Sequence, residues 1–209
     1  RLNFNFDGIW SEEYGLIQIS TDSGMYDEAM GAGRSIVETK MNGNDKPLFS
    51  RIEESPLSFD MTIAFTDKFT DDDIDRIIRW LFVDYYKPLY FEGKEDRIYY
   101  CLPEGEPKIV HNGLQQGYFT ISMRCDSARI YSPYIITNNE TITGTKTITV
   151  TNDGHDDIYP EISIRKVGAG TITIESLDDF GQIFQIKDLT NGEDIYLNSE
   201  KEIIQTDIV

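Results

Sequence analysis

The sequence has few of the residues that enzymes and metal sites most often use. It contains two histidines and two cysteines in 209 residues, and no apolar run approaches the roughly 20 residues of a membrane span. Basic residues are also scarce, because 19 lysines and arginines stand against 37 aspartates and glutamates, giving a net charge of −18. This acidity, which both halves of the sequence share, argues against sequence-reading DNA binding and membrane adsorption, and the lack of a long apolar run argues against membrane insertion. It is compatible with a wall past which DNA slides without sticking.

The remaining reactive side chains form no recognisable catalytic or metal-binding motif. His155 lies among carboxylates in NDGHDDIYPEIS (152–163), but neighbouring side chains on such a segment point in different directions, so a solvated turn before a strand is favoured. His111 lies in a turn-like link, and the sequence has no nucleophile elbow, calcium ladder or phosphate-binding glycine motif. We therefore expect a non-enzymatic protein with no catalytic residue, no metal and no cofactor.

The two cysteines, Cys101 and Cys125, both fall in strand-like stretches. Cys125 is on the apolar side of its strand, beside Met123. Buried free thiols in a reducing compartment are favoured over a disulfide.

Strict period-two alternation predicts that the protein is mainly β. In LSFDMTIAF (57–65) and YFTISMRC (118–125), every second residue is apolar, which is typical of a strand with one buried face. The residues expected to face inward are Leu57, Phe59, Met61, Ile63, Phe65, Phe119, Ile121, Met123 and Cys125. Further strands are expected at 2–6, 14–20, 97–102, 146–151, 161–167, 170–176, 183–189 and 194–198.

One segment has helical periodicity instead. Apolar residues recur at helical spacing after residue 70 and predict one amphipathic helix lying across a sheet. Thr70 and Asp73 resemble a capping box, and Pro88 is expected to end the helix. The expected apolar stripe is Ile74, Ile77, Ile78, Leu81, Phe82 and Tyr85; the expected surface ion pairs are Asp72–Arg76 and Asp75–Arg79.

Residues 21–56 predict a long hairpin, because two strand-like runs, SIVETKM and PLFSRI, flank an Asn-Gly pair. A long two-stranded hairpin is unlikely to be stable alone, so we expect it to pack on a neighbouring chain. The candidate subunit-contact residues are Ile36, Val37, Met41, Asn42, Gly43, Leu48 and Phe49.

Composition shifts near residues 127–139 and predicts two domains, 1–132 and 133–209. Both tryptophans and the helix precede the shift. The expected strands that follow it are rich in Thr and Ile and recur at the regular short spacing typical of a β-sandwich. Tyr159, Phe180 and Tyr196 could form a sugar-binding platform, although packing in the core or at a subunit contact is favoured.

Taken in order, these elements resemble the distal tail protein family of long-tailed, non-contractile bacteriophages that infect Gram-positive hosts. The resemblance covers nearly the whole sequence, from NFDGIWSEEYGLIQIS through SPLSFDMTIAF and RIIRWLFVDYYKPLYFEG to LTNGEDIYLNSEKEIIQTD. The second half carries the most recognisable signature, which is Asn152, Gly154, Tyr159, Pro160 and Ile162. Family members usually continue past the equivalent of IIQTD into closing strands. Either the sandwich is therefore incomplete in this sequence, or the remaining strands are disordered or removed.

This resemblance implies a split β-barrel first domain (1–132) with one α-helix and a protruding hairpin, followed by a galectin-like or carbohydrate-module-like β-sandwich (133–209). Six copies would form a hub ring at the tail tip that conducts DNA without binding it specifically and is assembled in the host cytoplasm. Its partners would be the tail tube protein, the tape-measure protein and a tail-associated lysin or receptor-binding protein. The alternative is a host-surface carbohydrate-binding module of a phage adhesion device.

Overall fold

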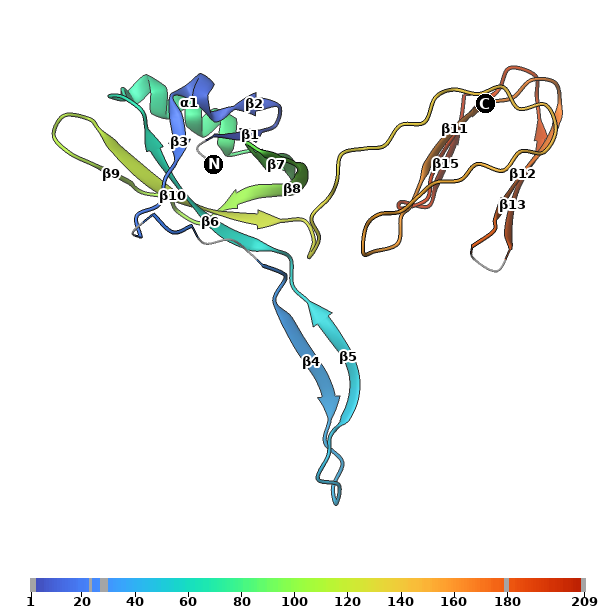
Figure 1. Cartoon of the computed structure of the whole chain (residues 1–209), viewed down its shortest axis with the longest axis horizontal. Helices are drawn as coiled ribbons and strands as arrows, with labels where there is room; N and C mark the ends of the chain where they lie inside the picture. Colours follow the sequence, from blue (N-terminus) through green and yellow to red (C-terminus); the bar gives the residue numbers. More distant parts are fainter. Residues whose placement is uncertain (1–2, 23, 27–29, 179–180, 208–209) are drawn as a thin grey trace. The chain divides into compact units, whose positions relative to one another are not determined.

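The computed structural model describes residues 3–22, 24–26, 30–178 and 181–207. The chain divides into two compact units, unit 1 (Arg1–Asn138) and unit 2 (Asn139–Val209). Unit 1 is a curled, half-barrel antiparallel sheet with one α-helix, and unit 2 contains two small antiparallel sheets (Figure 1). The protein is therefore mainly β, as predicted, whereas a galectin-like sandwich for unit 2 stays a prediction.

Eight strands form the main sheet of unit 1. Their order is β2-β1-β7-β8-β10-β6-β3, and β9 pairs with β10. The strands are β1 (Phe4–Phe6), β2 (Ile9–Trp10), β3 (Leu16–Gln18), β6 (Ser58–Phe65), β7 (Lys87–Phe91), β8 (Lys94–Glu104), β9 (Ile109–His111) and β10 (Gly117–Cys125). A short 3-10 helix, η1 (Ser11–Tyr14), follows β2.

The two strands with the clearest alternation, β6 and β10, pair with each other near the middle of this sheet. Their apolar residues are buried or packed against the core of unit 1, as the alternation predicted. The opposite face is polar: the Thr62 and Thr120 hydroxyls are 3.0 Å apart, and Ser122 Oγ donates to Asp60 Oδ1 over 2.5 Å. One face of the sheet therefore holds the core, and the other presents hydroxyl and carboxylate groups.

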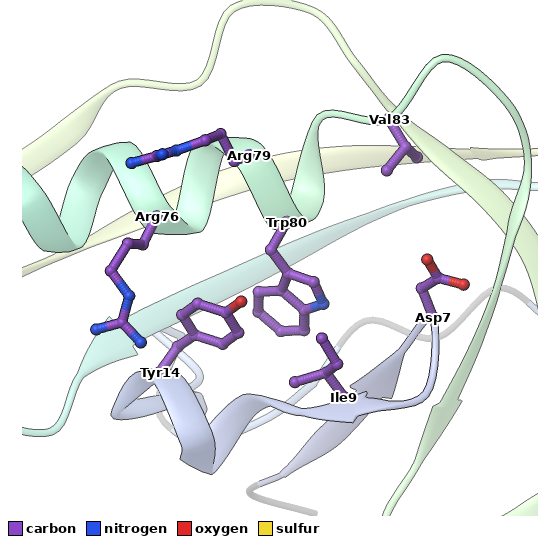
Figure 2. Close-up of a pocket in the computed structure, with 7 residues that line it drawn as sticks. All are labelled: Asp7, Ile9, Tyr14, Arg76, Arg79, Trp80 and Val83. Atoms are coloured by element: carbon purple, nitrogen blue, oxygen red, sulfur yellow. The ribbon is translucent and has the colours of Figure 1, made fainter.

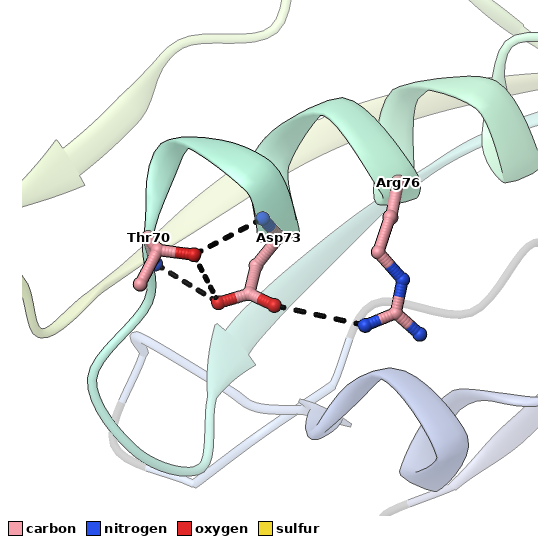
Figure 3. Close-up of polar contacts among 3 residues, drawn as sticks. All are labelled: Thr70, Asp73 and Arg76. Carbon is pink, nitrogen blue, oxygen red and sulfur yellow. Dashed lines mark hydrogen bonds and ion pairs between the residues drawn. The ribbon is translucent and has the colours of Figure 1, made fainter.

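The one α-helix among the described residues, α1 (Asp71–Leu81), begins at the predicted capping box. Thr70 Oγ1 accepts a hydrogen bond from Asp73 N, and the Asp73 carboxylate accepts in return from Thr70 N over 3.0 Å (Figure 3). Two of the free N–H groups at this helix end are thereby satisfied. The two hydrogen bonds from Thr70 hold the pKa of the Asp73 carboxyl below its usual value.

The end of α1 and its buried face differ from the prediction. The helix stops at Leu81, and Pro88 lies inside β7, where it fits extended backbone. The buried side chains are Ile77, Trp80 and Leu81, whereas Tyr85, which was expected on the apolar stripe, lies beyond the helix and is 62% exposed. The chain leaves the helix early because it must reach β7, which pairs with β1.

The expected ion pairs along α1 are also wrong. Arg76 Nη1 lies 3.8 Å from Asp73 Oδ1 at i,i+3 spacing, and Arg79 Nε donates to the backbone carbonyl of Asp75 over 3.0 Å. The Asp73 carboxylate, which the capping box holds at Thr70, also lies within reach of Arg76 (Figure 3).

Unit 2 contains one sheet of β11 (Glu161–Arg165), β14 (Asp194–Asn198) and β15 (Ile203–Thr206), and a second sheet of β12 (Gly170–Ser176) and β13 (Gln182–Leu189). Leu189, Ile195 and Leu197 form its buried core. The strand expected at 146–151 is not formed, and this segment is exposed throughout. Its Thr/Ile alternation suits a strand, but no neighbouring strand pairs with its backbone groups here.

Candidate functional site

A two-stranded ribbon, β4 (Arg34–Thr39) and β5 (Leu48–Glu54), exposes several large apolar side chains of unit 1. It forms a sheet of its own, and Figure 1 shows no other strand or helix of unit 1 alongside it. The side chain of Ile36 is 66% exposed, that of Leu48 63% and that of Phe49 59%. Isolated two-stranded ribbons are marginally stable in water, and the exposed apolar side chains make this ribbon the candidate contact surface of unit 1.

The two faces of this ribbon differ in chemistry. Ile36 lies opposite Ile52, and Glu38 lies opposite Phe49, past a register shift between Val37 and Glu38. Because side chains alternate along the uninterrupted β4 strand, these four residues share one face, which we call the apolar–acidic face. The other face carries Val37 and Thr39 opposite Arg51 and Leu48.

The base of the ribbon is held by polar contacts. Ser55 N donates to Gly33 O over 2.9 Å, and Arg34 Nη2 lies 2.9 Å from Glu54 Oε1. Arg51 pairs with Glu53 in the same strand. These exposed ion pairs orient the ribbon more than they stabilise it.

The predicted Asn-Gly pair lies in the loop at the tip, residues 40–47, and the strands end before it. Asn44 N donates to Met41 O over 3.2 Å. Gly43 has a backbone φ of 85°, which residues other than glycine rarely adopt. Of the seven candidate contact residues, Met41, Asn42 and Gly43 are therefore in this loop, and Ile36, Val37, Leu48 and Phe49 are in the strands. Their contact with a second chain stays a prediction.

A pocket of about 400 Å³ opens between α1 and the segment from β1 to η1 (Figure 2). Its lining residues are Asp7, Ile9, Tyr14, Arg76, Arg79, Trp80 and Val83. Sequence reasoning missed this pocket, because its two walls are far apart in the sequence. The one available signal was Trp80, which falls three residues after Ile77 on the buried side of the helix.

The walls of the pocket are held by stacked rings and hydrogen bonds. The rings of Trp80 and Tyr14 lie 4.5 Å apart with planes 9° from parallel, and Arg76 Cζ lies 5.3 Å from the centre of the Tyr14 ring. Trp80 Nε1 donates to Phe6 O over 3.0 Å. At the other end, Asp7 Oδ2 lies 2.8 Å from Lys87 Nζ, whose hydrogen bond with Asp7 raises the pKa of the lysine. The pocket is therefore aromatic and apolar in its middle, with charged groups around it.

The polar stretch around His155 is a turn. Asn152 Oδ1 accepts from Gly154 N over 2.9 Å, and Asn152 Nδ2 donates to Asp156 O over 2.8 Å, while the stretch itself is exposed. No group of three His, Cys, Asp or Glu side chains that could hold a metal ion occurs within 3–22, 24–26, 30–178 and 181–207.

The other signature residues lie where this turn joins β11. Tyr159 is 59% exposed, Pro160 O accepts from Ser199 N over 3.3 Å, and Ile162 packs against the core of unit 2. Tyr196 lies in β14, where its hydroxyl accepts from Asn198 Nδ2 over 3.3 Å, and Phe180 lies outside the described residues. The signature role of these residues stays a prediction.

Cys101 and Cys125 are buried free thiols, as predicted. They lie directly opposite each other on β8 and β10. The hydrogen bond with Cys125, together with burial, raises the pKa of the Cys101 thiol. Both thiols are shielded from solvent.

Comparisons with known proteins agree on one class. The family model described as "Phage tail protein N-terminal domain" matches residues 1–127. The SPbeta prophage-derived uncharacterized protein YomH of Bacillus subtilis (strain 168) is 29% identical over 206 residues, which cover 98% of this chain and 81% of the relative. No helix in the described part of the chain has the length and apolar composition needed to cross a bilayer.

Two solved structures are similar to this chain. One is SPP1 Dit (gp 19.1), described as a paradigm of the hub adsorption apparatus in Gram-positive-infecting phages. It has a TM-score of 0.58 at 13% identity, covering 99% of this chain and 82% of that one, so the two share a fold. The other is from the phage p2 baseplate in its activated conformation with Sr, with a TM-score of 0.48 at 12% identity, covering 99% and 83%.

Proposed function

The chain belongs to the family described as the phage tail protein N-terminal domain, and we propose that it is a distal tail protein whose six copies form a hub ring. In this proposal the ring joins the tail tube to the adsorption apparatus and conducts DNA. It acts as a scaffold and has no catalytic role.

The observation that carries this proposal is the exposed ribbon β4–β5. Apolar side chains stand on both of its faces, and no other strand pairs with its edges within the described residues. A closed ring of identical subunits needs two different, complementary surfaces on each subunit, and an extended arm supplies one of them. Covering the ribbon with a neighbouring copy would bury side chains that are otherwise in water.

The polar face of the main sheet supports the conduit. On β6 and β10 this face carries Thr62, Thr120, Ser122 and Asp60, and the whole chain has a net charge of −18. Arg124 also lies on this face, near the end of β10, but the hydroxyl groups and the Asp60 carboxylate around it offer DNA phosphates no cation, so a channel lined by this face would hold DNA weakly.

The expected partners follow from this position at the virion tail tip. The tail tube protein and the tape-measure protein would meet one face of the ring. A tail-associated lysin or receptor-binding protein would meet the other face. The fold shared with SPP1 Dit supports this placement.

Electron microscopy combined with light scattering on the protein tests the proposal. Six-fold rings would support the hub. A monomer that binds wall polysaccharide would overturn it in favour of a carbohydrate-binding module, and a monomer that binds nothing would overturn it as well.

A further inference from the structure

We propose that the apolar–acidic face of the ribbon in one copy docks into the α1 pocket of the next copy, with Glu38 pairing with Arg79. This inference rests on the proposed ring and names the two surfaces that would meet in it. The occupant of the pocket is thus a defined segment of a second copy of this chain.

The apolar–acidic face has the composition that the pocket requires. Ile36, Ile52 and Phe49 form an exposed apolar group, and Glu38 lies directly opposite Phe49. The other two glutamates on the ribbon pair with arginines of the ribbon itself, Glu53 with Arg51 and Glu54 with Arg34. Among the described residues no cation lies within ion-pair distance of Glu38, so its exposed carboxylate is available to a partner.

The pocket complements the ribbon face in apolar character and in charge. Ile9, Tyr14, Trp80 and Val83 give it apolar and aromatic walls. Arg79 is held in place by the hydrogen bond from its Nε to Asp75 O, and no carboxylate within the described ranges pairs with its other nitrogens. A carboxylate from another chain would fit the free N–H groups of Arg79 well.

The ribbon and the pocket are different surfaces of the same unit. Each copy can therefore offer its ribbon to one neighbour and its pocket to the other, which is the head-to-tail contact that closes a ring. In the single chain the apolar–acidic face is exposed and the pocket is open, so the chain does not satisfy the contact by itself.

Charge reversal tests the contact. Glu38→Arg and Arg79→Glu each place like charges together at the interface, so each should raise the protein concentration at half-assembly by about tenfold or more, measured by sedimentation velocity. The double variant Glu38→Arg/Arg79→Glu restores an opposite pair and should recover assembly. Glu53→Arg, the same change on the other face of the ribbon, is the matched control and should assemble like the unmodified chain.

The outcomes separate this inference from the ring itself. Unmodified protein that forms no ring would overturn the proposed function. If the unmodified protein forms rings, single reversals that assemble normally would overturn the docking site and leave the ring standing. Circular dichroism verifies that each variant folds. The docking site would also be overturned if the double variant did not recover assembly, or if Glu53→Arg lost assembly as strongly as the single reversals.

Discussion

Trp80 of α1 lies flat against Tyr14 of η1, with ring centres 4.5 Å apart, while its indole nitrogen donates to the carbonyl of Phe6. One side chain thus joins the helix to two segments more than 60 residues earlier in the sequence. The stack also fixes one wall of the pocket and positions Arg76 over the outer face of Tyr14. The core of unit 1 and its candidate docking pocket therefore depend on the same residue.

Replacing Trp80 with alanine should destabilise unit 1 by about 3–5 kcal/mol, because the change removes a large buried ring and leaves a cavity. Trp80→Phe keeps a ring but loses the hydrogen bond from Nε1 to Phe6 O, so it should cost about 0.5–1.5 kcal/mol. Urea unfolding followed by circular dichroism measures both changes. Equal losses in the two variants would contradict the role assigned to the ring.

Removing the helix cap should weaken α1 in a defined way. Thr70→Ala should cost about 1 kcal/mol, because Asp73 N loses its acceptor. Denaturant unfolding followed by tryptophan fluorescence reports this loss, since both tryptophans, Trp10 and Trp80, lie in unit 1. The nearby exposed substitution Asp72→Ala, outside the capping box, is the control and should have a smaller effect.

The cap should also make stability depend on pH. The pKa of the Asp73 carboxyl is lower in the folded protein than its usual 3.8. The stabilisation from its charged form is therefore fully present above pH 3.8 and is lost as the pH falls through the folded value. Asp73→Asn should be less stable than the unmodified chain at neutral pH, and the difference should shrink as the pH falls below 3.8. A difference that stayed constant with pH would refute the assignment.

The cysteine pair should be unreactive in the folded protein. Cys101 and Cys125 are buried, and the hydrogen bond between them together with burial raises the pKa of the Cys101 thiol, which disfavours its reactive thiolate. We expect modification by Ellman's reagent to proceed only as fast as unit 1 unfolds. Lys46→Cys, in the exposed loop at the tip of the ribbon, should react at once and serves as the control. Rapid modification of the native pair would contradict the burial.

The ribbon should be needed for assembly and dispensable for folding. Replacing residues 35–53 with a short Gly-Ser turn should abolish ring formation while shifting the melting temperature by no more than about 3 °C, because the core of unit 1 lies elsewhere. Light scattering and calorimetry measure the two effects separately. A shortened chain that still forms rings would show that the ribbon is not the subunit contact.

Local patterns predicted several elements correctly. The alternation at 57–65 and 118–125 identified both the strands and their buried sides, and Thr70 with Asp73 marked the start of the helix. The same reasoning failed at 146–151, where equally regular alternation forms no strand. Alternation shows which side of a strand would be buried, but a strand also needs a neighbour whose backbone groups it can pair with.

The end of the helix shows a second limit. Phe82 and Tyr85 continue the apolar spacing of α1, yet the helix stops at Leu81 because the chain turns toward β7 and its pairing with β1. The pairing of β7 with β1 therefore overrides the local apolar spacing, which determines the last residue of a helix only weakly.

The sequence by itself determined the mainly β character, the one capped helix, the exposed hairpin and the acidity, because these depend on neighbouring residues or on composition. Only the tertiary structure brought Trp80 onto Tyr14, set Cys101 opposite Cys125, and placed Arg79 beside an aromatic pocket and Glu38 opposite Phe49 on the ribbon. These relationships join segments that are distant in the chain. Strand register and helix packing decide them, and neither can be read from local spacing.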